Sequence, residues 1–205
     1  MKSLLSLLPL FELLTVSAVV VSCSNSEARF AKEVPGVWQG TPEMFSDSQA
    51  GSATIVDTFT FDPVVETPNS TLTGNVTITG MVNTTTQIVG DSSFIEPLSL
   101  SVAAHTTISG TWTVTDDDEI SLSLDPGSLS VAVDPDAVLI NGTDLPLGAP
   151  AIDSIRPAAC KNIEQSIRAA LTARYASMAK LDDVKVKGKL LKYEINEQDF
   201  VLTRQ

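Results

Sequence analysis

The sequence predicts an all-β fold with one late α-helix, in which an antiparallel meander closes into a β-barrel; a β-sandwich is the alternative. The first observation is the stretch from Thr106 to Val133, where three short runs alternate apolar and polar residues. An acidic run at 116–119 and an Asp-Pro-Gly-Ser run at 125–128 separate them. Alternation with a period of two is typical of half-buried strands, so these runs predict neighbouring antiparallel strands.

The second observation is a longer alternating run from Leu72 to Val82. One of its faces is apolar and the other is almost entirely Thr and Asn, while Gly74 and Gly80 on the apolar face indicate bends or bulges. Further strands are predicted at 34–44, 53–61, 88–89 and 98–102. About eight strands therefore precede residue 140, as expected for a sandwich or an up-and-down barrel.

The third observation is a helical repeat late in the chain. Apolar residues recur there at intervals of three and four: Ile163, Ile167, Leu171, Tyr175 and Met178. This spacing predicts an amphipathic helix at about 156–180, entered near Pro157, that packs against the sheet or caps the mouth of the barrel. Alternation at 184–190, a turn at 196–198 and a last run at 200–204 predict two closing strands.

The N-terminus begins with a basic residue, Lys2, followed by an apolar run that ends in Val20-Val21-Ser22-Cys23. These four residues resemble the lipobox of bacterial lipoprotein signal peptides. The resemblance implies that residues 1–22 are removed, that Cys23 carries lipid, and that 23–33 form a polar tether. The protein would then be anchored to the outer membrane of a Gram-negative bacterium, on its periplasmic face or at the cell surface. An ordinary secretory signal or an uncleaved membrane helix is the alternative.

Composition excludes several functions. A net charge of −12 and a pI near 4.3 argue against nucleic acid, whose phosphates require clustered Lys and Arg. His105 is the sole histidine, and lipidation of Cys23 leaves Cys160 as the one thiol, so neither a disulfide nor a His/Cys zinc site is expected. No Gly-x-Ser-x-Gly motif is present. The acidic run 116–119 is interpreted as a solvated turn. We therefore predict no catalytic residue, metal or cofactor, and no enzyme.

The order of elements carries a second resemblance. Gly36-Val37-Trp38 lies in the first predicted strand, and a late helix precedes the closing strands. Residues 34–205 thus resemble lipocalin-like, or more widely calycin-type, barrels. The resemblance implies that Trp38 lies at the closed end of the barrel and that Arg204 packs over its ring. The sequence departs from typical lipocalins in having two predicted strands after the helix.

A closed barrel of about eight strands has room for one small ligand if its inner side chains do not fill it. The inner faces predicted here are apolar, which favours a hydrophobic ligand. The candidate lining residues are Phe59, Phe61, Val76, Ile78, Val102, Ile108 and Leu122. The alternative is that they form a filled core. The protein would then be a non-catalytic structural module, or one that binds another envelope protein through an exposed apolar patch or sheet edge.

Overall fold

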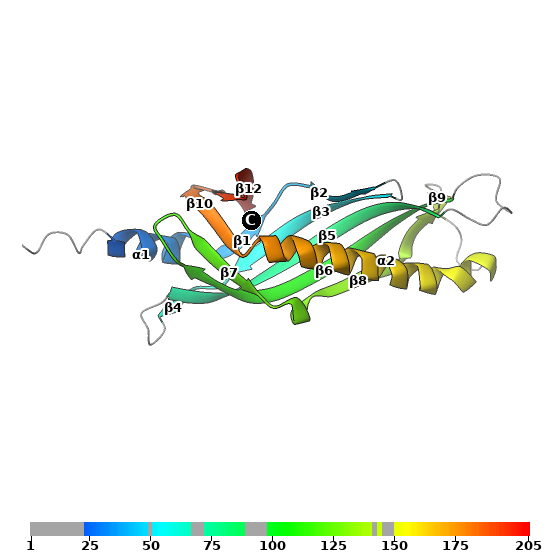
Figure 1. Cartoon of the computed structure of the whole chain (residues 1–205), viewed down its shortest axis with the longest axis horizontal. Coiled ribbons are helices and arrows are strands. Elements are labelled where there is room, and N and C mark those ends of the chain that lie inside the picture. Colours follow the sequence, from blue (N-terminus) through cyan, green and yellow to red (C-terminus); the bar gives the residue numbers. More distant parts are fainter. Residues whose placement is uncertain (1–22, 49–50, 67–71, 89–97, 141–142, 145–149) are drawn as a thin grey trace, which may run out of the picture.

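The fold is described from a computed structural model, which places residues 23–48, 51–66, 72–88, 98–140, 143–144 and 150–205 (Figure 1). Within these ranges, all strands and two α-helices lie between Cys23 and Arg204. A fragment that begins at Ser24 therefore keeps every described strand and all of α1 except its first residue.

Eight antiparallel strands form a closed ring. In ring order they are β1 (Gly36–Gln39), β3 (Gly51–Phe61), β5 (Leu72–Ile88), β6 (Leu98–Val114), β7 (Ile120–Leu124), β10 (Lys180–Lys187), β11 (Leu190–Ile195) and β12 (Gln198–Arg204), and β12 pairs with β1 again. Each strand pairs with the next strand of the ring in chain order, so the ring is an up-and-down meander. The predicted fold class is confirmed.

Four more strands pair outside the ring. They are β2 (Glu43–Ser48) beside β3, β4 (Val65–Glu66) beside β5, β8 (Ser130–Ile140) beside β6, and β9 (Thr143–Asp144) beside β8. Strand β1 pairs with residues 58–61 of β3 and β2 with residues 51–55; likewise, β7 pairs with 110–114 of β6 and β8 with 100–107. The long strands thus belong to the ring at one end and to an open sheet, here called the extension, at the other.

The helix α2 (Pro150–Ser177) lies along the extension and contacts β8 and β2 (Figure 1). Ile167, Leu171 and Tyr175 are buried, and so is Met178 just after the helix. The amphipathic stripe predicted from the sequence therefore packs against the sheet. A short 3₁₀ helix, η1 (Pro126–Ser128), follows β7.

The predicted tether is wrong as a description of residues 23–33. They form α1 (Cys23–Glu33), and Phe30 and the following Val34 are fully buried in the core. The cause is the hydrophobic effect, because these two apolar side chains interrupt an otherwise polar segment and cover the end of the ring.

Several predicted strand boundaries also differ. The predicted strand 34–44 divides into β1 and β2, because the run Gly40-Thr41-Pro42 lies between them. In contrast, the predicted strands 98–102 and 106–115 join into β6, and β5 continues without a break to Ile88. These two strands pair with each other along their full lengths. Their mutual hydrogen bonds keep the backbone extended in segments where apolar and polar residues alternate only weakly.

The start of the helix and the number of strands after it also differ from the prediction. Helix α2 begins at Pro150, so Pro157 lies inside it and removes one backbone donor without ending the helix. Three strands follow instead of two. Gly188 adopts φ = +63°, a conformation that glycine accepts at little cost, and reverses the chain between β10 and β11.

Candidate functional site

The inner face of the sheet contains one polar row between apolar rows. Cross-strand pairing of β3, β5 and β6 aligns Asp57 with Gly80 and Gly80 with Thr106. The neighbouring row toward the ring is Phe59–Ile78–Ile108, and the row toward the extension is Ile55–Val82–Ala104. The polar row therefore lies where the ring passes into the extension.

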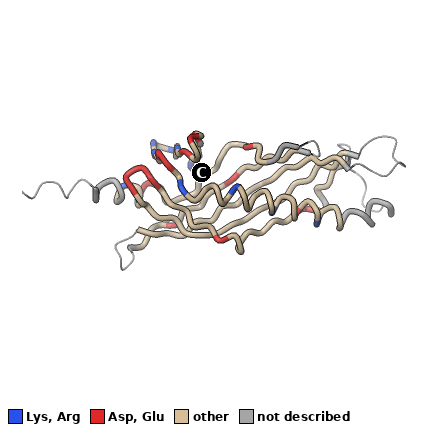
Figure 2. The backbone as a smooth tube through the Cα atoms, viewed as in Figure 1, with Lys and Arg blue, Asp and Glu red and all other residues tan. Residues whose placement is uncertain are grey.

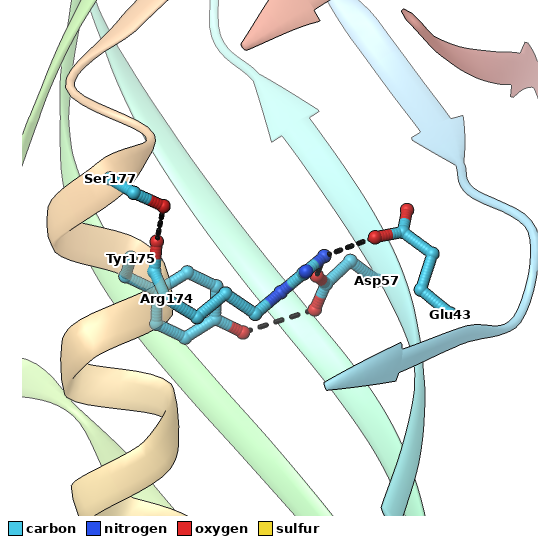
Figure 3. A network of polar contacts seen from close by, with 5 residues as sticks. All are labelled: Glu43, Asp57, Arg174, Tyr175 and Ser177. Atoms are coloured by element: carbon cyan, nitrogen blue, oxygen red, sulfur yellow. Dashed lines mark hydrogen bonds and ion pairs between the residues drawn. The ribbon is translucent and has the colours of Figure 1, made fainter. Parts of the chain in front are cut away.

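Helix α2 brings two polar side chains to this row. The Tyr175 hydroxyl donates a hydrogen bond to Asp57 Oδ1 at 3.0 Å, and Arg174 Nη2 lies 2.9 Å from both Asp57 Oδ2 and Glu43 Oε2 (Figure 3). Ser177 Oγ donates to the backbone carbonyl of Arg174 at 2.6 Å. Glu43, Asp57, Arg174 and Tyr175, here called the Asp57 cluster, thus join β2, β3 and α2.

Gly80 provides the space that this cluster requires. A Cβ atom at residue 80 would lie 2.4 Å from Thr106 Oγ1, 2.8 Å from Ile55 Cδ1 and 3.1 Å from Asp57 Oδ1. Contacts this short are not tolerated by real side chains, so any larger residue would displace the carboxylate or its neighbours. The glycine on the apolar face of β5 therefore has a packing role.

Burial is the main cause of the pKa shifts of Asp57 and Tyr175 in the cluster. Asp57 is 4% exposed, and its removal from water raises the pKa of its carboxyl above the ordinary value of 3.8 although Arg174 opposes the shift. Burial likewise raises the pKa of the Tyr175 hydroxyl, and Asp57 adds to that shift. Tyr175 therefore acts as a hydrogen-bond donor. Arg174 is shared by two carboxylates, which leaves the ionised cluster with one net negative charge.

A small hollow adjoins the cluster on the other side of Arg174. Its volume is about 170 Å³, and its lining residues are Arg174, Ser177, Met178, Ile195, Asn196, Gln198 and Phe200. Ligand pockets for drug-sized molecules are commonly about 300–1,000 Å³. The hollow has room for a few water molecules and not for an extended hydrophobic ligand.

Burial of the α2 stripe decreases toward the N-terminal end of the helix. Leu171 and Ile167 are 0% and 4% exposed, whereas Ile163, Cys160 and Ala159 are only half-buried. The inner face of the extension, which α2 covers, is apolar: Ala53, Ile55, Val82, Leu100, Val102, Ala104, Val133 and Val138. We call the contact between α2 and this face the seam, and the part of it formed by Ala159, Cys160 and Ile163 the seam mouth.

Polar contacts hold α2 from Glu164 onward. Glu164 Oε1 accepts a hydrogen bond from the Val133 backbone at 3.2 Å, and the Arg168 guanidinium donates to the carbonyl of Leu129. Together with the Asp57 cluster, these contacts fix the second half of the helix on the sheet. Glu164, Arg168 and Arg174 all lie C-terminal to the seam mouth.

The structure brings most of the predicted ligand-lining residues together, but it packs them against one another. Phe59, Phe61, Val76, Ile78, Ile108 and Leu122 line the ring, and Val102 lies in the extension. The rings of Phe59 and Phe61 stack 6.0 Å apart, and Phe61 meets Trp112 edge-on at 5.5 Å. The described part of the ring interior is thus filled. Contact of these residues with a ligand stays a prediction.

Trp38 and Arg204 close the end of the ring next to α1. The Arg204 guanidinium carbon lies 4.2 Å from the centroid of the Trp38 ring, so the contact expected from the lipocalin-like resemblance is present. Trp38 Nε1 donates to the carbonyl of Val34 at 2.7 Å, and Arg204 donates to the carbonyls of Glu33 and Pro35. Arg204 thereby ties the last strand to the end of α1.

Sequence reasoning missed the Asp57 cluster. One signal was available, because Asp57 stands at an inner position of β3, between Ile55 and Phe59, and breaks an apolar alternation. Its partners Arg174 and Tyr175 could not be assigned, since they are more than 100 residues away.

The structure also shows where the other residues named in the prediction lie. Cys23 is the first residue of α1, His105 is exposed, and Asp116, Asp117 and Asp118 form an exposed turn. Within the described ranges, no three His, Cys, Asp or Glu side chains converge as a metal ion would require. No α-helix in the same ranges has the length and hydropathy to span a bilayer. Lipid on Cys23 stays a prediction.

Comparisons of this chain with protein-family models, with curated protein sequences and with solved structures find no match.

Proposed function

We propose that the protein is a lipid-anchored lipoprotein of the outer membrane that binds a small hydrophobic ligand at the seam mouth. The observation that carries this proposal is the fall in burial along α2, over an apolar sheet face. In this proposal the ring is a filled scaffold, and the ligand lies between Ala159, Cys160 and Ile163 on one side and residues such as Val102 and Val138 on the other.

Energetics favour movement at the seam mouth over movement elsewhere on α2. Releasing the second half of the helix would break the buried Asp57–Arg174 pair, and breaking such a pair costs about 3–5 kcal/mol. It would also expose Leu171 and Met178, at about 1.5–3 kcal/mol each. Movement at the seam mouth exposes Ala159, Cys160 and Ile163, which are already half in water. A ligand can therefore enter at the mouth while the cluster stays intact.

Two aromatic variants of the fragment that begins at Ser24 test the site. Ala159→Phe adds a ring inside the mouth, whereas Lys161→Phe adds the same ring to an exposed position of α2. Binding of a fluorescent fatty-acid analogue is expected to fall at least about tenfold for Ala159→Phe and to change less than about twofold for Lys161→Phe. Equal effects of the two variants would contradict a site at the mouth.

The lipid anchor has its own test. Changing Cys23 to Ala removes the thiol to which lipid is attached, so the protein should move from the membrane to the soluble fraction. Retention in the membrane fraction would contradict lipid attachment at this residue.

A second candidate function is a non-catalytic module that binds another envelope protein. The filled ring favours it, and so do two exposed apolar residues on strands at sheet edges, Met44 on β2 at 63% and Val65 on β4 at 71%. Unpaired strand edges with apolar side chains are sites where another chain can add a strand. Pull-downs that are lost with Met44→Lys would support this function.

A further inference from the structure

The hairpin of β10 and β11 has a basic tip in an otherwise acidic protein. Lys185, Lys187, Lys189 and Lys192 are all exposed and lie within eight residues, although the whole chain has 13 basic and 25 acidic residues (Figure 2). Four of the 13 basic residues, almost a third, thus lie in this tip. Such a concentration suits an anionic partner.

The cross-strand register places some of these charges against one another. Lys185 lies directly opposite Lys192, and Lys187 lies opposite Leu190. Like charges at directly opposed positions destabilise a sheet, and an anionic partner would relieve this cost. Lys185 is paired with Asp183 at 2.6 Å, but Lys187, Lys189 and Lys192 make no ion pair within the described residues.

The tip also presents apolar side chains to solvent. Leu190 and Val201 are each 39% exposed, and Val201 lies opposite Lys192 on the same outer face. A Cβ atom built at Gly188 meets nothing within 4 Å, so the turn projects from the barrel. Exposed lysines around isolated apolar residues suit the headgroup region of a membrane, where the charges meet phosphate and the apolar groups meet acyl chains.

The tip lies at the end of the ring to which the chain from Cys23 is attached. The Arg204 backbone N–H donates to the Lys189 carbonyl at 2.8 Å, and Arg204 stacks on Trp38, which follows α1 closely. Helix α1 has 11 residues, about 16 Å at 1.5 Å per residue. A lipid on Cys23 would therefore hold this end of the barrel close to the bilayer.

Several acidic groups lie close to Lys185. Asp183 is paired with it, and Asp183, Glu194 and Asp118 all raise the pKa of its ammonium group. In the cross-strand register Asp182 lies opposite Glu194 and Glu194 opposite Asp199, so an acidic row adjoins the row of Lys185 and Lys192 on the side away from the turn. The exposed turn of Asp116, Asp117 and Asp118 lies on the same side, because the Asp118 backbone carbonyl accepts a hydrogen bond from the Val184 backbone N–H. Contact with an anionic surface is therefore restricted to the side of the tip that carries Lys187, Lys189 and Lys192.

We propose that the tip of this hairpin, through Lys187, Lys189, Leu190 and Lys192, binds the surface of an anionic phospholipid membrane and orients the barrel on it. The orientation part of this inference rests on the proposed lipid anchor at Cys23. Binding by the tip does not. A basic patch beside an anchor adds electrostatic attraction to anionic lipids.

Vesicle sedimentation with the fragment from Ser24, which has no lipid, tests the tip alone. The fragment should bind vesicles of phosphatidylcholine mixed with phosphatidylglycerol and should not bind pure phosphatidylcholine. Lys187→Glu changes the charge by two units and should weaken binding about twenty-fivefold, because each unit of charge near an anionic surface changes affinity about fivefold. The matched reversal Lys161→Glu, on α2, should change binding less than about twofold. Added salt should abolish binding.

Either of two results would overturn the proposal. One is absence of binding to the anionic vesicles by a fragment whose circular dichroism shows the folded sheet; the hairpin would then serve some other acidic partner or none. The other is an equal loss with Lys187→Glu and Lys161→Glu, which would reflect net charge instead of the tip. Neither result bears on Cys23 or on the seam mouth, because this experiment involves no anchor and no hydrophobic ligand.

Discussion

Asp57 and Tyr175 are separated by 118 positions in the sequence, yet the tyrosine hydroxyl donates a hydrogen bond to the carboxylate at 3.0 Å in the interior of the protein. This contact and the neighbouring ion pair with Arg174 fix the end of α2 on the sheet. They lie where the filled ring ends and the extension begins. The position of the seam mouth depends on this attachment.

Removal of the Asp57 side chain should destabilise the protein strongly. Asp57→Ala leaves Tyr175 without its acceptor and leaves Arg174, which is 18% exposed, with Glu43 alone. We expect a loss of about 3–5 kcal/mol in the free energy of unfolding, the usual cost of breaking a buried pair. Asp57→Asn keeps an acceptor for Tyr175 and should lose less. Urea unfolding measures both, and equal losses would show that the hydrogen bond contributes nothing.

The Asp57 carboxyl should also give stability a specific pH dependence. Its pKa in the folded protein is raised above the ordinary 3.8, so the folded state binds the proton more tightly than the unfolded state. The contribution of this group is therefore fully present below pH 3.8 and is lost as the pH rises through the folded pKa. The difference in unfolding free energy between wild type and Asp57→Asn, measured against pH, isolates it. An increase of that difference with rising pH would contradict a raised pKa.

Gly80→Ala tests whether the polar row is as tightly packed as the distances indicate. The added methyl would lie 2.4 Å from Thr106 Oγ1, and overpacking of this kind costs about 1–3 kcal/mol. Because the hydroxyl of Thr106 is the nearest obstacle, Thr106→Ala in the same chain should recover part of the loss. Thermal unfolding of the single and double variants makes the comparison, and strictly additive losses would contradict a clash between these two residues.

Arg204 should matter for the attachment of α1. Arg204→Ala removes the cation–π contact with Trp38, worth about 0.5–2 kcal/mol, and the hydrogen bonds to Glu33 and Pro35. Arg204→Lys keeps the charge but not the planar fork, so an intermediate loss is expected. Limited proteolysis should cleave the Ala variant earliest within α1. Wild-type resistance of α1 in that variant would show that Phe30 and Val34 hold the helix unaided.

Features with a local sequence signature were predicted correctly. The hairpin of β6 and β7 follows from alternation around an acidic turn, and the α2 stripe follows from its spacing of three and four. The contact between Trp38 and Arg204 was available only through a family resemblance, because nothing in either segment indicates the other.

The features that could not be predicted from the sequence depend on contacts between segments that are far apart in the chain. The full length of β5 and β6 comes from their mutual hydrogen bonds, and Phe30 became part of the core because the end of the ring needs an apolar cover. Asp57 stood out as a polar residue at an inner position, but its stability there depends on where α2 docks. The register that places Lys185 opposite Lys192 likewise requires the turn at Gly188.

Native mass spectrometry of the fragment from Ser24, produced in a bacterial periplasm, tests the central claim most directly. The account predicts an extra mass that solvent extraction removes, that is retained by Lys161→Phe and that is absent from Ala159→Phe. Cys160, the one cysteine of this fragment, should be alkylated more slowly while the mass is bound, because it lies at the seam mouth. An extra mass retained equally by both variants, with no change in the alkylation of Cys160, would contradict ligand binding at the seam mouth.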